Sequence, residues 1–351
     1  MIKAGFRSAR GETLPIFIEQ EVGLLRYIVN RILIAIPLIF VISIAVFVII
    51  QLPPGDFFDQ YRLRLEKDGI RVSPETIQQM RAEYGLDQPL PIQYFMWIKA
   101  IVLHGDFGFS FDYNQPVANL IWERLFLTVL VNIFVLGLIW LIAIPVGVFS
   151  ATHKYTVIDY VLNLIAFFGT GMPGFVLALV LMWLAFAYWG ADVGGLFSPA
   201  FVSAPWNLDK VIDLMKHIWV AVIVLAVGQT SELIRTMRAN MLDELPKPYV
   251  DTARAKGLRE NAVVRKYPLR VALNPFISGI GRDFREVLSG SQVTAIVLNL
   301  PTTGPLLLQA LLSQDMYLAG SFILILSVFG IVGTMVSDIL LALFDPRIRY
   351  T

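Results

Sequence analysis

The stretch that decides the fold is Tyr249–Asn274, YVDTARAKGLRENAVVRKYPLRVALN, a basic segment between two long apolar runs. The basic residues between positions 238 and 270 are Arg238, Lys247, Arg254, Lys256, Arg259, Arg265, Lys266 and Arg270, against the acids Asp243, Glu244, Asp251 and Glu260. Short loops rich in Lys and Arg between membrane spans stay on the cytoplasmic side. We therefore expect a cytoplasmic loop over residues 237–270.

The same stretch has the pattern of two short helices around a glycine turn. Asp251 suits the start of the first helix, because a carboxylate complements the positive end of the helix dipole. Val250, Ala253 and Gly257 recur at i, i+3 and i+7, which predicts one face for close contact. Gly257 ends this helix, and residues 259–267 begin a second one before a proline. Any cytoplasmic loop of a membrane protein can carry this charge. The helix–glycine–helix pattern is a more specific signal, because an ordinary loop does not require it.

Composition places the chain in a membrane. Hydrophobic residues make up 56% of the sequence and charged residues 16%, whereas soluble domains carry about 25% charged residues. The chain has no cysteine, three scattered histidines and no G-x-x-x-x-G-K-[ST] phosphate loop. We therefore expect no catalytic residues, no metal site and no cofactor on this chain, with any ATP and Mg²⁺ bound by partner subunits. A net charge of +1 gives no sign of a nucleic-acid partner.

Apolar runs predict an all-α integral membrane protein with six transmembrane helices. About 20 apolar residues suffice for a crossing, and the runs cover residues 27–52, 125–149, 157–189, 217–236, 271–300 and 318–344. The predicted divisions are an N-terminal tail over 1–24, the first span over 25–52, an insertion over 53–118, and a core of five spans over 119–351. Basic residues flank the first and last spans, which predicts that both termini are cytoplasmic.

The insertion over 53–118 is too polar to cross a membrane, so we expect a small extracytoplasmic helical subdomain. Ser73-Pro74-Glu75 predicts a helix start and Gly85 its end. A second helix is expected over 89–103, with Tyr94 and Trp97 at the membrane interface.

Glycines and prolines interrupt the next two spans in this prediction. They are Pro145 and the cluster Gly169, Gly171, Pro173 and Gly174. Such residues permit close packing or a kink, or else they line a moving pore.

The fifth span carries four charges, Arg282, Asp283, Arg285 and Glu286. A central charge costs about 2.5–3.5 kcal/mol on insertion scales, so these side chains must avoid lipid. A polar stripe at helical spacing predicts how these side chains avoid lipid. Its members are Ser278, Arg282, Arg285, Ser289, Gln292 and Asn299, with Glu286 paired at i, i+4 to Arg282. The stripe is a candidate translocation path, and an equally weighted alternative is mutual neutralisation at a structural interface.

The basic stretch resembles the coupling motif of binding-protein-dependent ABC importer permeases. Ala253, Gly257 and Leu269 match its general form, and TARAKGL over 252–258 is similar to the oligopeptide/dipeptide branch. The sequence of residues 85–111 and the C-terminal segment Asp-Pro-Arg-Ile-Arg over 345–349 resemble the same branch. The resemblance runs from about residue 25 to the end, although the charges of the fifth span are unusual for the family.

The resemblance implies a type I ABC importer permease in the cell inner membrane. It implies as partners a second homologous permease subunit, two ATPase subunits, an extracytoplasmic solute-binding protein and membrane lipid. It assigns ATPase coupling to Asp251, Thr252, Ala253, Arg254, Ala255, Lys256, Gly257, Leu258 and Leu269. The expected cargo is a peptide, with an oligosaccharide or nickel as alternatives.

Two other classes remain open from sequence. An ion- or proton-coupled secondary carrier would use the charges of the fifth span as a relay. A membrane-embedded enzyme is disfavoured, because the predicted spans hold no cluster of histidine or of nucleophile and base.

Overall fold

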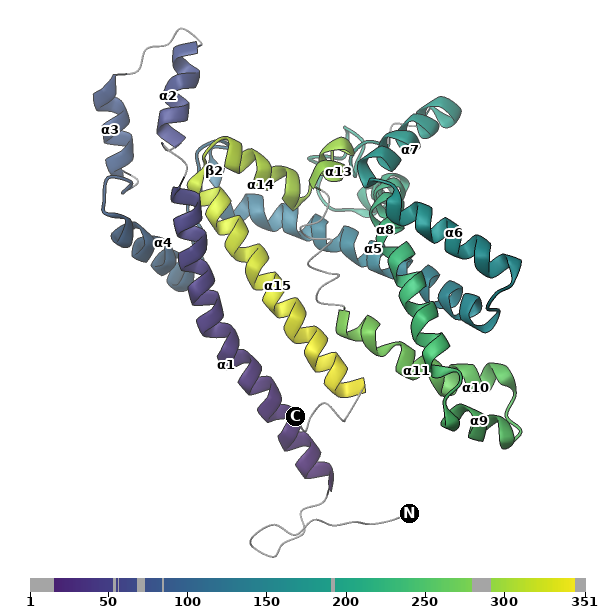
Figure 1. The fold of residues 1–351 in the computed structure, drawn as a ribbon. Helices are drawn as coiled ribbons and strands as arrows, with labels where there is room; N and C mark the ends of the chain where they lie inside the picture. The colour runs from purple at the N-terminus through teal and green to yellow at the C-terminus, as the bar shows by residue number, and fades with distance from the viewer. Residues whose placement is uncertain are drawn as a thin grey trace, which may run out of the picture.

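The computed structural model describes residues 16–52, 55, 57–67, 73–83, 85–190, 193–279 and 292–344, and these are mostly helical (Figure 1). In chain order the elements are α1 (Ile16–Gln51), α2 (Phe57–Lys67), α3 (Pro74–Glu83), α4 (Leu90–His104), β1 (Phe109–Ser110), β2 (Gln115–Pro116), α5 (Val117–Thr152), α6 (Val157–Gly171), α7 (Gly174–Trp189), α8 (Leu208–Glu244), α9 (Pro248–Ala255), α10 (Glu260–Lys266), α11 (Pro268–Ala272), α13 (Gln292–Val297), α14 (Thr303–Leu312) and α15 (Met316–Phe344). The two short strands pair antiparallel, with Ser110 opposite Gln115.

Membrane-spanning helices dominate this part of the chain, as predicted. Within the described ranges four helices are long and apolar enough to cross a membrane, namely α1, α5, α8 and α15, and α6 with α7 makes a fifth if the two count as one span. The predicted fifth span, 271–300, falls partly outside the described residues, which include a helical segment over 274–279 and then α13. The count of six spans therefore stays a prediction.

The predicted interruption of the 157–189 run at its glycine and proline cluster is confirmed, because the chain breaks there into α6 and α7, whose axes differ by 101°. The break falls at Met172 and Pro173: Met172 is extended, with φ −87° and ψ 121°. A residue before proline is pushed out of the helical region, and proline donates no backbone hydrogen bond. Pro145, in contrast, lies inside α5, which continues unbroken to Thr152, so the predicted interruption at Pro145 is wrong.

The largest buried cluster lies where α5, α6 and α7 pack on α8, with Val135, Ile139 and Met237 among its members. Two glycines permit the close approach. A Cβ on Gly147 of α5 would stand 2.6 Å from the Cβ of Met237, and one on Gly169 of α6 would meet the Ser231 hydroxyl. This lack of space favours close packing as the role of both glycines.

A second group of helices is formed by α1, α4 and α15, which lie side by side (Figure 1). Arg31 Nη2 of α1 lies 3.0 Å from Asp338 Oδ2 of α15. Tyr94 and Trp97 of α4 are buried against α1 and α15, and the Tyr94 hydroxyl lies 2.8 Å from Ser43 Oγ. These two aromatics therefore fix α4 to its neighbours, and their position at a membrane–water interface stays a prediction.

The insertion after α1 is helical, as predicted. Ser73 Oγ accepts a hydrogen bond from the Thr76 backbone N–H at 3.3 Å at the start of α3, and Gly85 has a φ of +68° just beyond its end. The helix α2 was not predicted. Its Phe57 and Phe58 pack against Ile77 of α3.

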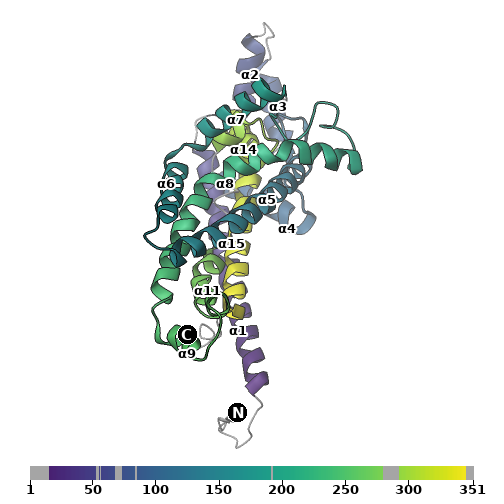
Figure 2. The ribbon, with the colours of Figure 1, turned by 90° about the vertical axis from the view of Figure 1, so that its right-hand side faces the viewer.

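The insertion and the basic loop lie at opposite ends of the molecule. Both views place α2 and α3 at one end, and the first turns of α1, the last turns of α15 and the α9 region at the other (Figures 1 and 2).

Candidate coupling and translocation sites

The helix–glycine–helix unit forms where the sequence predicts it. Pro248 occupies the first turn of α9, Asp251 lies in that same turn, and Gly257 follows the helix with a φ of +74°. A left-handed conformation suits glycine because it has no Cβ. The chain then turns into α10, and Pro268 begins α11.

The inner face of this unit is used within the chain. Val250 and Ala253 of α9 are buried together with Val263 of α10, and Tyr267 packs against them. Gly257 is exposed, with nothing within 4 Å of where a Cβ would stand. The predicted contact face is therefore correct for Val250 and Ala253, whose partner is α10, and wrong for Gly257.

The outer face of the unit is polar and open. The residues Asp251, Thr252, Arg254, Ala255, Lys256, Gly257 and Leu258 are all exposed. Leu269 differs from them, because it packs against the main buried cluster. Seven loop members of the predicted coupling set are thus accessible, whereas Ala253 is buried against α10 and Leu269 packs against the helical core.

Arg254 ties the two helices of the unit together. Its Nη2 lies 2.8 Å from Glu260 Oε1, its Nε donates to Glu260 Oε2 at 3.2 Å, and its Nη1 donates to Asp251 Oδ1 at 3.1 Å. The Arg254 guanidinium lowers the pKa of Glu260, and the hydrogen bond to Glu260 raises the pKa of Arg254. These groups are exposed, so the fork fixes geometry more than it adds stability.

A second joint connects α8 to α9. Glu244, the last residue of α8, is mostly buried and accepts hydrogen bonds from Lys247 Nζ at 2.5 Å and from the Tyr249 hydroxyl. Burial raises the pKa of Tyr249, and the bond to Glu244 raises it further. A phenol that stays protonated is the form that can donate here, so the joint holds α9 at a fixed angle to α8.

Sequence reasoning missed a buried ion pair near this joint. Arg238 of α8 donates from Nε and Nη2 to the two carboxylate oxygens of Asp159 on α6, at 2.8 Å each. Asp159 is 1% exposed and also accepts from Ser150 Oγ, from the Tyr155 backbone at 3.0 Å and from Asn163 Nδ2 at 2.8 Å. Arg238 is therefore a half-buried helix residue and not one of the free loop cations that the sequence suggested.

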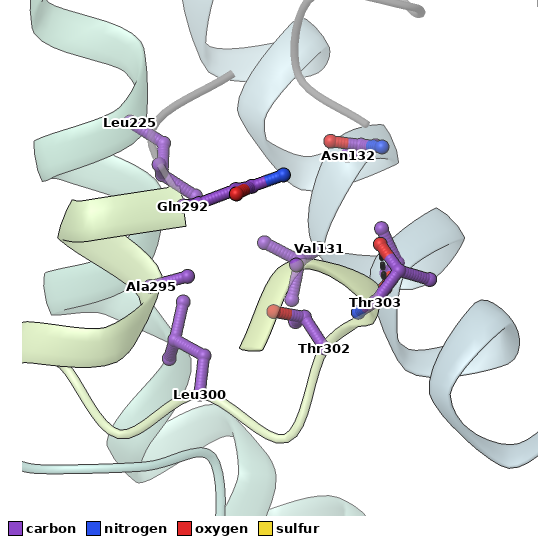
Figure 3. A pocket seen from close by; sticks show the side chains of 10 residues that line it. Val131, Asn132, Leu225, Gln292, Ala295, Leu300, Thr302 and Thr303 are labelled. Atoms are coloured by element: carbon purple, nitrogen blue, oxygen red, sulfur yellow. Dashed lines mark hydrogen bonds between the residues drawn. The ribbon is translucent and has the colours of Figure 1, made fainter. Parts of the chain in front are cut away.

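Three members of the predicted polar stripe, Ser278, Gln292 and Asn299, fall on described residues. Arg282, Arg285, Glu286 and Ser289 lie outside them, so the stripe as a whole stays a prediction. The Ser278 carbonyl accepts a hydrogen bond from Ser337 Oγ of α15 at 2.8 Å. Gln292 instead extends from α13 towards Asn132 of α5 (Figure 3). Ser278 therefore contacts α15, whereas Gln292 faces α5.

Gln292 joins a polar cluster that the sequence did not reveal. Thr128 and Asn132 of α5 line a small cavity together with Gln292, Thr302 and Thr303 (Figure 3). Thr128 Oγ1 accepts from the Thr303 backbone N–H at 3.0 Å, which fixes the start of α14 to α5. The spacing of Thr128 and Asn132, one helical turn apart, was the available signal, but their partners come from more than 150 residues later.

Comparison with known families gives the class of the protein. Residues 143–350 match the binding-protein-dependent transport system inner membrane component family, and residues 24–132 match the N-terminal domain of the same systems. The chain belongs to this family. It is therefore a multi-pass inner-membrane permease subunit, as the resemblance indicated.

Named relatives cover almost the whole chain. The oligopeptide transport system permease protein AppB of Bacillus subtilis is 34% identical over 326 residues, which are 92% of this chain and 99% of AppB. The oligopeptide transport system permease protein OppB of Haemophilus influenzae is 30% identical over 329 residues, which are 93% of this chain and all of OppB. Membership favours a binding-protein-dependent importer over both the ion-coupled carrier and the membrane enzyme.

Proposed function

We propose that this chain forms half of the translocation pathway of an ATP-driven peptide importer and that α9 and α10 form its contact with an ATPase subunit. One observation carries the proposal: the exposed, polar outer face of the helix–glycine–helix unit is joined rigidly to α8. A force applied to that face would therefore act on a helix that packs on α5, α6 and α7.

The length of α8 supports a contact outside the membrane. Its 37 residues span about 55 Å at 1.5 Å per residue, whereas the hydrocarbon core is about 30 Å thick. The apolar middle of α8 can therefore cross while both ends project. The α9–α10 unit follows directly after the projecting C-terminal end.

Charge supports the orientation. Lys247, Arg254, Lys256, Arg259, Arg265, Lys266 and Arg270 favour the cytoplasm for this loop. The first turns of α1 and the last turns of α15 lie at the same end (Figures 1 and 2), which supports cytoplasmic termini. The insertion, at the opposite end, would then be extracytoplasmic and available to a solute-binding protein.

Partners and cargo follow from the relatives. A second homologous permease subunit would complete the pathway among membrane lipids, and two ATPase subunits would bind ATP and Mg²⁺, with no cofactor on this chain. AppB and OppB are named as oligopeptide permeases, which supports peptides over oligosaccharides or nickel. Affinity of the partner binding protein for a peptide panel, an oligosaccharide panel and Ni²⁺ separates the three cargoes.

In this mechanism the outer face of α9 sits in a groove of the ATPase. Closure of the ATPase moves α9, and the joint of Glu244 with Lys247 and Tyr249 passes that motion to α8. The Asp159–Arg238 pair makes α6 move with α8. The predicted result is a switch of access from outside to inside.

Gly257→Val tests the coupling role. A β-branched residue is strongly disfavoured at positive φ, so α9 and α10 would lose their mutual angle although no neighbour is struck. Gly190→Val is the matched control, because Gly190 also has positive φ (+59°) and open space but ends α7 instead. We expect Gly257→Val alone to abolish solute-stimulated ATP hydrolysis in the reconstituted complex, with both variants inserted normally. Full stimulation in Gly257→Val would contradict the proposal.

A further inference from the structure

A large cavity opens at the end of α8 that is opposite the α9–α10 unit. It has a volume of about 750 Å³ and is lined by the start of α5, the segment over 194–206, the first turn of α8 and the residues around the start of α14. Its wall carries the charged residues Glu123, Arg124 and Lys210. We call it the vestibule.

Lys210 shapes one side of the vestibule. Its ammonium lies 4.9 Å from the centre of the Phe197 ring and 5.2 Å from that of Trp206, and it donates to the Ala204 carbonyl at 2.6 Å. A cation held between two aromatic faces and a carbonyl is fixed in place. This wall is therefore ordered.

Next to the vestibule lies the small polar cavity of Figure 3, which we call the neck. The two cavities share the lining residues Leu300 and Thr302, so they are adjacent. The neck has a volume of about 20 Å³, room for about one water molecule. It is a constriction and not a chamber.

The neck holds an unsatisfied donor. Asn132 is 1% exposed, and its Nδ2 finds no hydrogen-bond partner within the described part of the chain. A buried amide donor without a hydrogen bond costs free energy. A bound solute that accepts this hydrogen bond would therefore gain more binding free energy than it would at an exposed residue. The Gln292 side chain reaches towards the same space from α13 (Figure 3).

We propose that the vestibule and the neck form one solute route and that Asn132 and Gln292 hydrogen-bond the main-chain amide groups of a peptide passing between α5, α13 and α14. A carboxamide offers both a donor and an acceptor, which match the carbonyl and the N–H of a peptide bond. Every peptide carries these groups whatever its side chains, and the described neck lining is uncharged. The route deepens the proposed function, on which it rests for the choice of a peptide.

The sequence has no cysteine, so single-cysteine variants report on one position each. The experiment uses the complete complex in right-side-out vesicles, where Thr302→Cys places a thiol at the point where the vestibule meets the neck. Ile133→Cys is the control. Ile133 lies beside Asn132 on the membrane-spanning helix α5 and is 59% exposed, so lipid and not water would cover it. We expect a membrane-impermeant methanethiosulfonate to label Thr302→Cys and not Ile133→Cys. Absence of labelling at Thr302→Cys would overturn the route.

Amide recognition is tested with trialanine and with the depsipeptide of the same length, whose ester bonds lack N–H donors. We expect trialanine to slow the labelling of Thr302→Cys about tenfold more than the depsipeptide does. Adding Asn132→Leu or Gln292→Leu should remove that difference, whereas adding Ile133→Ala should preserve it. Equal protection by both probes, or a difference that survives both leucine variants, would overturn the assignment.

Labelling needs no ATP hydrolysis, so the result of this test is independent of the result of the coupling test. Loss of peptide protection with intact coupling through Gly257 would refute the neck and leave the proposed function standing. Normal protection with Gly257→Val fully active would refute the coupling contact and leave the neck.

Discussion

Two arginine–carboxylate pairs in this chain have the same chemistry and opposite settings. Arg254 and Glu260 are six residues apart in the α9–α10 unit, with side chains 39% and 58% exposed. Arg238 and Asp159 are 79 residues apart and join α8 to α6, with side chains 23% and 1% exposed. Burial, and not the hydrogen-bond lengths, separates a pair that shapes a surface from a pair that holds two helices together.

The largest expected effect comes from Arg238→Ala. It leaves the Asp159 carboxylate buried without its cation, which costs about 3–5 kcal/mol. Arg254→Ala, the exposed counterpart, should cost less than about 1 kcal/mol. Unfolding of the detergent-solubilised chain by SDS, followed by circular dichroism, measures both. Equal losses in the two variants would break the comparison.

A double variant sharpens this test. Asp159→Asn combined with Arg238→Gln removes both charges while keeping side chains that can hydrogen-bond, so part of the stability lost in Arg238→Ala should return. A double variant no more stable than Arg238→Ala would point to side-chain packing and not to the stranded charge.

The next effect concerns the same helix packing. Gly147→Ala would force a Cβ to within 2.6 Å of the Met237 Cβ, and overpacking of this kind costs about 1–3 kcal/mol. Gly137→Ala is the matched control on α5, because nothing lies within 4 Å of its Cβ position. That variant should be neutral or stabilising by up to about 1 kcal/mol, since alanine is the better helix former. The same SDS titration measures the stability of both variants. A Gly147→Ala variant as stable as Gly137→Ala would exclude the close contact.

The smallest effect is the pH dependence of the exposed pair. Because Arg254 holds the pKa of Glu260 below its ordinary value, the pair stabilises the fold above the ordinary glutamate pKa of about 4.3. That contribution is lost as the pH falls through the lower folded-state value. Hydrogen exchange of residues 248–267, corrected for the intrinsic pH dependence of exchange, should show this as faster opening of α9 and α10 in acid. Glu260→Gln should remove the extra acid sensitivity, and raised salt should weaken it at neutral pH.

Local patterns predicted the coupling unit well because its contacts are local. Asp251, Gly257 and Pro268 act on backbone conformation within a few residues, and Val250 meets Val263 only 13 positions later. The caps at Ser73 and the end at Gly85 were predictable for the same reason.

The failures share a different cause. The packing of Trp97 could not be predicted, because it shares a buried cluster with Leu324 of α15, more than 200 residues later. Pro145 and Pro173 were both predicted to interrupt their spans, and only Pro173, which lies between Met172 and Gly174, breaks its helix. The sequence analysis did not single out Asn132, because its cavity is formed only when α13 and α14 lie beside α5.

The sequence by itself determined that this protein crosses a membrane many times and belongs to the importer permeases, and it determined where a helix–glycine–helix unit follows α8. Hydropathy, basic flanks and turn residues act over short stretches, so their effects can be predicted from the sequence alone. Only the tertiary structure decided that Arg238 meets Asp159, that α6 and α7 diverge, and that Asn132 shares a cavity with Gln292. Those outcomes depend on which distant helices exclude lipid and water together, and that is a property of packing.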